Sequence, residues 1–298
     1  MTTRIELIKK HIAMIAAIHV VAIWGETFVS SKVLLEHGLK PADIFFYRFT
    51  LAYICMWFVS RRRLMADSVK DETLFVALGV LGGSLYFLFE NMALVYSTAS
   101  NVAILVGSAP LITALVLAIF YKDERMHGIQ IAGSAIAFLG MVMVITNGQL
   151  ILHLNPLGDA LALGAALTWS LYSLVIKNLS EHYDSAFITR KVFAYGLITI
   201  LPYFLLHPLN TDPDTLAQPV VWVNLLYLAF IASMGCFLAW NWALTKLGTV
   251  RTTNIIYLQS LFTMFISAMV LHETITIVAI AGAVILIAGM VLAAKKRK

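Results

Sequence analysis

Long hydrophobic runs recur along the whole chain, and short polar segments separate them. A helix of about 20 apolar residues is long enough to cross the hydrocarbon core of a bilayer. The longest polar stretch, from His207 to Pro219, has three prolines and two aspartates and predicts a loop. The sequence therefore predicts an all-α membrane protein with ten transmembrane helices. The predicted helices are at about 12–35, 43–60, 73–95, 99–121, 127–146, 157–179, 186–206, 220–245, 251–271 and 275–294.

The composition agrees with a chain that is solvated mostly by lipid. Of the 298 residues, 60% are hydrophobic and only 12% are charged, whereas roughly a quarter of the residues in a soluble protein are charged. The polar side chains are too few to cover a water-facing surface, so the backbone must satisfy its hydrogen bonds within helices. The formal net charge of +5 is therefore no sign of nucleic-acid binding.

The reactive residues show no pattern of a metal, cofactor or catalytic site. Cys55 and Cys236 lie far apart in apolar runs, without the spacing of a disulfide or metal-ligand motif. The sequence has no Walker loop, no His-Glu-x-x-His and no Gly-x-Ser-x-Gly, which argues against an intramembrane enzyme. A channel should show a ring of like charges or a carbonyl filter, and neither is visible. We expect no cofactor.

Basic residues are distributed unevenly between the two sides of the predicted membrane. If the N-terminus is cytoplasmic, only Lys40 lies among the loops of the opposite side. This bias is a strong positive-inside signal. An even number of helices then places both termini in the cytoplasm, and we expect a multi-pass protein of the inner membrane. The basic residues assigned to the cytoplasmic side are Arg4, Lys9, Lys10, Arg61, Arg62, Arg63, Lys70, Lys122, Arg125, Lys177, Lys246, Arg251, Lys295, Lys296, Arg297 and Lys298.

The stretch from Asn91 to Val142 occurs twice, which indicates an internal duplication. The two halves, residues 1–150 and 151–298, then carry five helices each. Because five is an odd number, the second half is inverted relative to the first. Inverted repeats are typical of secondary transporters, whose substrate site lies near the midplane between the repeats. The repeated residues, 149 positions apart, are Glu124 and Glu273, Gly133 and Gly282, and Gly140 and Gly289.

Some of the repeated positions, with others in the first two helices, match a known family pattern. They are Trp24-Gly25, Arg48 after Phe45-Phe46, Pro110, Asp123-Glu124, Gly133, Gly140, Glu273, Gly282 and Gly289. With these residues the chain resembles the ten-helix EamA-type branch of the drug/metabolite transporter superfamily, over about residues 12–294. One departure is Gln259, which stands where Pro110 predicts a proline, so we expect a weaker break in the ninth helix. The resemblance implies transport of small organic solutes, often the export of amino acids or related metabolites.

Polar residues found in only one half are the better functional candidates, because residues shared by both halves serve the fold that the halves share. Glu26 in the first helix and Glu90 in the third have no carboxylate at the matching position, and ionisable residues within a membrane are mostly functional. His19, Glu26 and Ser30 form one helical stripe that we expect to face the interior. Burial there favours the protonated carboxylate and suits proton coupling by Glu26. The alternatives are a permanent Glu26–Arg48 ion pair and a water-exposed Glu90 at the interface.

The remaining candidates surround a predicted break in the fourth helix. Pro110 removes a backbone donor and frees a carbonyl, which is tolerated at membrane depth where the backbone lines a cavity or is buried in protein. Simple kinking and close helix packing are the alternatives for this break and for the aromatic residues. The predicted substrate-binding residues are Trp24, Glu26, Tyr86, Glu90, Asn101, Ser108, Trp169, Tyr172 and Tyr257.

Three pairs of polar residues recur in both halves and are assigned to the fold. The pairs are Asn91 and Asn241, Glu124 and Glu273, and Arg48 and Arg190. The asparagines suit helix–helix hydrogen bonds, the glutamates suit helix N-termini, and the arginines can reach the membrane interface. A substrate carboxylate is the alternative partner of the arginines.

The sequence thus predicts a secondary transporter that moves a small metabolite, an amino acid or a similar amphipathic solute, by alternating access. Export is favoured, with proton coupling. Uptake, and a nucleotide-sugar or drug substrate, remain alternatives within transport; an intramembrane enzyme or a channel is the alternative outside it. The expected partners are the metabolite and the lipid bilayer, with no nucleic acid, and the expected state is a monomer or a weak homodimer.

Overall fold

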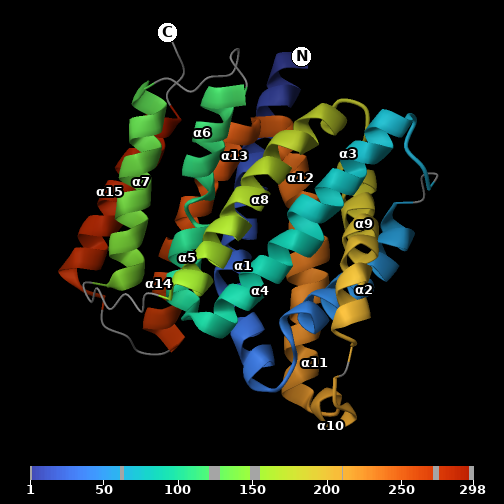
Figure 1. The fold of residues 1–298 in the computed structure, drawn as a ribbon. Helices are drawn as coiled ribbons and strands as arrows, with labels where there is room; N and C mark the ends of the chain where they lie inside the picture. The colour runs from blue at the N-terminus through green and yellow to red at the C-terminus, as the bar shows by residue number, and fades with distance from the viewer. Residues whose placement is uncertain are drawn as a thin grey trace.

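The computed structural model describes residues 2–60, 64–120, 128–147, 155–209, 211–270 and 275–294. These residues form helices and connecting turns, with no strand among them. The helices pack side by side as one bundle, and α1 begins on the same face of the bundle on which α15 ends (Figure 1). Two ends on one face are what an even number of crossings requires.

All ten predicted segments are confirmed within a few residues, except that the first helix begins ten residues earlier. Four of the segments are built from more than one helix, and a short helix, α10, lies in the predicted polar loop. In chain order the helices are α1 (Thr2–Glu36), α2 (Pro41–Val59), α3 (Val69–Gly79), η1 (Val80–Ser84), α4 (Leu85–Tyr96), α5 (Ala99–Val106), α6 (Ala109–Phe120), α7 (Gly128–Thr146), α8 (Pro156–Ser180), α9 (Ser185–Leu206), α10 (Pro213–Leu216), α11 (Pro219–Leu226), η3 (Tyr227–Gly235), α12 (Cys236–Leu247), α13 (Thr249–Asn254), η4 (Ile255–Leu258), α14 (Gln259–Val270) and α15 (Ile277–Ala293).

Short polar side chains fix where several of these helices begin. The Ser68 and Thr98 hydroxyls accept hydrogen bonds from backbone amides in the first turns of α3 and α5. The Asp184 carboxylate and the Thr276 hydroxyl do the same for α9 and α15. The first amides of a helix have no partner within the helix, so these caps satisfy donors at positions where apolar runs give way to turns.

The duplicated glycines hold α7 and α15 together. A Cβ atom added at Gly140 would lie 2.3 Å from the Leu286 backbone nitrogen, and one at Gly133 would lie 2.3 Å from that of Ala293. Small residues allow two helix backbones to approach this closely in a membrane. The crossing is antiparallel, because the later residue of α7 meets the earlier residue of α15. These two corresponding helices therefore run in opposite directions, as inverted repeats require. The duplicated Glu124 and Glu273 lie outside the described residues.

Departures from α-helical geometry also recur in both halves. The third segment contains the π-helix η1 and the eighth contains the π-helix η3. The fourth segment is interrupted at Gly107 and Ser108, and the ninth contains the 3-10 helix η4 just before Gln259. The ninth segment thus departs from the α-helix although it lacks the proline of the fourth.

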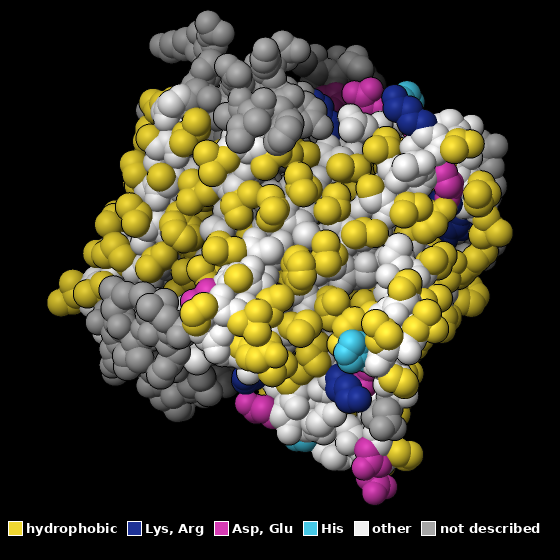
Figure 2. All heavy atoms as spheres, in the orientation of Figure 1, with side chains coloured by type: hydrophobic (Ala, Val, Ile, Leu, Met, Phe, Trp, Pro, Cys, Tyr) yellow, Lys and Arg dark blue, Asp and Glu magenta, His cyan; other side chains and the backbone are white. Residues whose placement is uncertain are grey.

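The outer surface of the bundle is apolar. Leu139, Leu205 and Phe58 expose 61%, 83% and 73% of their surface, which in water would favour aggregation. Figure 2 shows hydrophobic side chains over the middle of one face, with most charged side chains gathered near its two ends. Eight of the described segments are long and apolar enough to cross a membrane, and α15 is a shorter apolar helix. The bundle has the apolar surface and the long helices of a multi-pass membrane protein.

Candidate functional site

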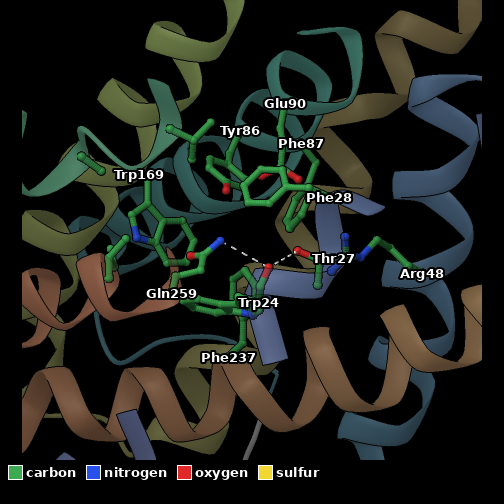
Figure 3. A pocket seen from close by; sticks show the side chains of 13 residues that line it. Trp24, Thr27, Phe28, Arg48, Tyr86, Phe87, Glu90, Trp169, Phe237 and Gln259 are labelled. Atoms are coloured by element: carbon green, nitrogen blue, oxygen red, sulfur yellow. Dashed lines mark hydrogen bonds between the residues drawn. The ribbon is translucent and has the colours of Figure 1, made fainter. Parts of the chain in front are cut away.

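A pocket lies inside the bundle where helices from both halves meet (Figure 3). Its free volume is about 40 Å³, enough for only a few water molecules, each of which needs about 10–15 Å³. The first half contributes α1, α2, α4, α5 and α6, and the second contributes α8, α12, η4 and α14. The lining residues are Trp24, Thr27, Phe28, Arg48, Tyr86, Phe87, Glu90, Val106, Ala109, Trp169, Phe237, Ile256 and Gln259.

Aromatic rings form most of the pocket wall. The ring centroids of Trp24 and Trp169 lie 5.2 Å apart, and those of Tyr86 and Trp169 lie 5.1 Å apart. Both separations are in the range of favourable aromatic contacts. The Trp24 indole donates a hydrogen bond of 3.0 Å to the Ala232 carbonyl in η3. The wall therefore joins α1, α4 and α8 across the two halves.

Arg48 supplies a buried positive charge to the pocket. It comes from α2 and exposes only 1% of its surface. Its Nε donates a hydrogen bond of 2.9 Å to the Ser233 hydroxyl, and its guanidinium carbon lies 4.4 Å from the centre of the Phe87 ring. Its Nη1 has no hydrogen-bond partner among the described residues. The guanidinium points from α2 toward Thr27 and the pocket (Figure 3).

Glu90 supplies a buried negative charge from α4. It exposes 2% of its surface and interacts with the Tyr86 hydroxyl, one turn earlier, and with Arg48. The expected alternative, a carboxylate exposed to water at the interface, is wrong because Glu90 is buried. Arg48 and Glu90 line the same pocket, yet no ion pair within the described part of the chain joins them. The pocket thus contains two buried groups of opposite charge that form no direct ion pair with each other.

The predicted break in the fourth helix is confirmed, and the residues on either side of it line the pocket. The Ser108 hydroxyl donates a hydrogen bond of 2.6 Å to the Leu105 carbonyl and closes the turn between α5 and α6. The Ala109 carbonyl accepts a hydrogen bond of 2.8 Å from the Ser170 hydroxyl of α8. Side chains thus satisfy backbone groups at the break, as a membrane interior requires.

Four of the nine predicted site residues meet in this pocket: Trp24, Tyr86, Glu90 and Trp169. Among the others, Tyr172 lies behind Trp169, with its ring stacked at 5.1 Å and its hydroxyl donating to the side-chain amide oxygen (Oδ1) of Asn241. Ser108 serves the break described above.

Asn101 and Tyr257 lie away from this pocket. The Asn101 amide donates hydrogen bonds to the Ser97 hydroxyl and the Asp159 carboxylate. Tyr257 is fully buried and packs with Met141 of α7 and Leu286 of α15. The described contacts of both residues join segments of the two halves.

The expectation that His19 and Glu26 face the interior is wrong, because both are exposed on α1. The buried face of this helix follows Ala13, Ala17 and Val20 at helical spacing and continues to Thr27 and Ser31. Small and apolar residues pack against neighbouring helices more favourably than a carboxylate does, so they set the rotation of α1.

The Glu26–Arg48 ion pair is not among the described ion pairs either. The buried carboxylate that interacts with Arg48 is Glu90. Ser30, the third member of the predicted stripe, is buried and donates to the Asn224 amide oxygen of α11.

Sequence reasoning missed most of the remaining lining residues. Thr27, Phe87 and Phe237 carry no signal by themselves, because polar and aromatic residues of these kinds recur elsewhere in the apolar runs, and Gln259 stands out only as the missing proline of the ninth helix. The match with Arg190 assigns Arg48 to the fold, with a substrate carboxylate as its alternative partner. Within the described residues, no group of three His, Cys, Asp or Glu side chains is placed to hold a metal ion.

A second cavity of about 70 Å³ adjoins the pocket. Phe28, Ile256 and Gln259 line both spaces. Among the described residues, the Gln259 side chain makes one hydrogen bond, a long one of 3.4 Å from its Nε2 to the Trp24 carbonyl. The other side of the cavity is mostly apolar, with small residues of α5 and with Met141 and Ile145 of α7.

Comparisons with known proteins agree with this architecture. The model of the EamA-like transporter family matches residues 11–146 and again residues 156–294. A solved structure titled "Crystal structure of protein" has a TM-score of 0.72 and 16% identity, and the match covers 95% of this chain and 97% of that one. At this identity the likeness concerns the fold alone.

Named relatives are similar over nearly their whole length. A "Probable amino-acid metabolite efflux pump" of Salmonella typhimurium is 30% identical over 284 residues, covering 92% of each chain. A "Probable terminal-alkyne amino-acid exporter" of Streptantibioticus cattleyicolor is 26% identical, covering 94% of this chain and 92% of the relative. An "Uncharacterized transporter" of Archaeoglobus fulgidus is 29% identical, covering 92% and 94%.

Proposed function

We propose that this chain, which belongs to the EamA-like transporter family, is a membrane transporter that exports an amino acid or a similar amphipathic metabolite. The observation that carries the proposal is the pocket between the two halves, where aromatic walls surround one buried cation and one buried carboxylate. Such a site suits a small solute with both charged and apolar parts. Inverted repeats around a central site suit alternating access. We place the protein in the inner membrane with both termini in the cytoplasm.

Export is preferred over uptake because two relatives carry efflux or export in their names. The direct test is counterflow, with purified protein in liposomes that contain an excess of one unlabelled proteinogenic amino acid. A carrier should concentrate the labelled amino acid transiently inside, because it exchanges one molecule for another. A channel would only equilibrate the label, and an intramembrane enzyme would change the solute chemically. If no amino acid shows counterflow, the proposed substrate class is wrong, and nucleotide sugars and drugs become the solutes to screen.

We assign proton coupling to Glu90 rather than to Glu26. Coupling by Glu26 requires an interior position, but the Glu26 side chain is exposed outside the pocket, whereas Glu90 is buried in it. Proton and solute can then compete for one carboxylate, which would link export to the inward proton gradient.

Glutamine variants distinguish the two carboxylates, because glutamine keeps the size and hydrogen bonding of glutamate but cannot bind a proton. We expect Glu90→Gln to abolish proton-driven transport while solute exchange persists at saturating concentration. Glu26→Gln should keep proton-driven transport near the wild-type rate. Transport against a gradient in everted membrane vesicles measures the first activity, and counterflow measures the second. The opposite result would return the coupling role to Glu26.

The break in the fourth helix should matter for transport more than for folding. Pro110→Ala restores a backbone donor in α6, beside Ala109, which lines the pocket. We expect the segment to straighten and the transport rate to fall several-fold, with a folded yield close to that of the wild type. Initial rates in proteoliposomes, together with size-exclusion profiles, measure both. Pro202→Ala in α9 is the matched control, because Pro202 also lies inside a helix but does not line the pocket. Equal rates for Pro110→Ala and the wild type would reduce the break to a packing feature.

A further inference from the structure

We infer that Arg48 and Glu90 together form a binding site for the carboxylate and ammonium groups of a free amino acid. The inference rests on the proposed function and names the part of the solute that the pocket recognises. It excludes solutes in which either charged group is blocked. The observations behind it are the guanidinium, whose Nη1 has no hydrogen-bond partner among the described residues, the buried carboxylate and the neighbouring cavity.

The Arg48 guanidinium is placed to receive an anion. A guanidinium offers five N–H donors in a planar fork that matches the two oxygens of a carboxylate. Only Nε is used by a described hydrogen bond, to Ser233, and the buried Nη1 has no partner in the described part of the chain. A buried, incompletely paired charge is unfavourable. An incoming carboxylate that accepts from this group would relieve that cost, and its negative charge would be balanced.

Glu90 limits which anions fit. A second negative group beside a buried carboxylate is unfavourable, which disfavours phosphates and dicarboxylates at this position. An ammonium group next to the carboxylate of the solute would instead meet the Glu90 side chain. The rings of Tyr86 and Phe87, which line the same pocket, also attract cations through their faces. A zwitterion with adjacent ammonium and carboxylate groups therefore satisfies both buried charges at once.

The second cavity offers space for the rest of the amino acid. The pocket alone holds a few waters, so binding needs the shared wall to move. Gln259 is the movable part of that wall, because its 3.4 Å hydrogen bond to the Trp24 carbonyl is at the long limit of such contacts. Once Gln259 turns away, the head group occupies the space between Arg48 and Glu90, and the side chain of the solute enters the apolar cavity beyond Phe28.

The test uses counterflow competition by three forms of the amino acid that exchanges fastest. These are the free amino acid, its amide, which lacks the carboxylate, and its N-acetyl derivative, which lacks the ammonium group. With the wild-type protein, each derivative should compete about tenfold more weakly than the free amino acid or worse, because each leaves one buried charge unpaired. A derivative that competes as well as the free amino acid would overturn the inference.

Two variants identify which residue binds the carboxylate of the solute and which binds its ammonium group. In Arg48→Gln the preference for the free amino acid over its amide should disappear, while the preference over the N-acetyl derivative remains. In Glu90→Gln the preference for the free amino acid over its N-acetyl derivative should disappear, while the preference over its amide remains. Because each readout is a ratio within one protein, partial loss of folded protein does not change it. Arg48→Lys, which keeps the charge but not the fork, should show an intermediate preference if Arg48→Gln fails to fold.

Matched controls come from the same chain. Arg190→Gln removes the counterpart arginine, which is buried but donates to the Ser60 carbonyl rather than lining the pocket. Glu26→Gln removes the exposed carboxylate of α1. Both should keep the wild-type ratios. If free amino acids exchange but the ratios of Arg48→Gln and Glu90→Gln equal those of the wild type, the site assignment fails. If no amino acid exchanges at all, the proposed function fails with it.

Discussion

Gly140→Val should destabilise the protein by about 3 kcal/mol and lower its melting temperature in detergent, with loss of monodisperse protein. The Cβ atom of any larger residue would lie 2.3 Å from the Leu286 nitrogen and 2.6 Å from the Gly282 carbonyl oxygen. Both are backbone atoms of α15, so no side-chain rotation relieves the contact. The two helices would have to separate, although Gly289 of α15 makes an equally close contact with the backbone of Ala137 in α7.

Gly128→Val is the matched control in the same helix. A Cβ atom at Gly128 meets nothing within 4 Å, and valine favours the helix over glycine by a few tenths of a kcal/mol. Its melting temperature should equal or slightly exceed that of the wild type. If Gly140→Val has the same melting temperature as Gly128→Val, the close crossing of α7 and α15 contributes little to stability.

The helices and the duplication could be predicted because both leave strong marks in the sequence. A membrane-spanning helix needs a long apolar run, so its position can be found without any knowledge of its neighbours. Gly133 and Gly140 recur with their exact spacing in the second half because the two helices that carry them pack on each other. The recurrence was visible in the sequence, but the pairing of α7 with α15 was not.

The charged residues of the pocket were harder to predict, because one of them, Arg48, has a matching arginine in the second half and therefore looks like a residue of the shared fold. Arg48 and Arg190 occupy matching positions, yet Arg48 lines the pocket and Arg190 donates to the Ser60 carbonyl with its guanidinium over Trp57. Two copies of one sequence pattern meet different neighbours once the copies pack on each other. Recurrence in both halves therefore shows that a residue suits the shared fold, and does not show that it lacks a function.

The direction in which the Glu26 side chain points could not be predicted from the fact that carboxylates are rare in apolar segments. An isolated carboxylate in an apolar run predicts function, but its direction depends on which face of α1 the neighbouring helices cover. That face carries Ala13, Ala17 and Val20, and the position of Glu26 follows from theirs. The helical spacing of small and apolar residues in the first helix was the better guide to orientation than the spacing of its polar residues.

Lys191→Met should have the other large effect, because it breaks a buried ion pair between α9 and α3. The Lys191 ammonium pairs with the Glu72 carboxylate, and their side chains expose only 6% and 15% of their surface. The same carboxylate accepts from the Tyr195 hydroxyl and from the Ala66 amide at 2.6 Å. Removing Lys191 leaves the mostly buried Glu72 carboxylate without its counter-charge, with Tyr195 and Ala66 as its remaining described partners, which costs about 1–3 kcal/mol.

The size of this effect should depend on the buried position of the pair rather than on charge alone. Lys9→Met is the matched control, because Lys9 pairs with Glu6 at 3.8 Å near the start of α1, where about half of each side chain is accessible. An exposed pair contributes about 0–1 kcal/mol, so Lys9→Met should melt close to the wild type while Lys191→Met melts far below it. In the double variant Glu72→Gln with Lys191→Met, no buried charge is left unpaired, and part of the lost stability should return. If the double variant is less stable than Lys191→Met alone, Glu72 stabilises the connection to α9 through Tyr195 and Ala66 rather than through the ion pair.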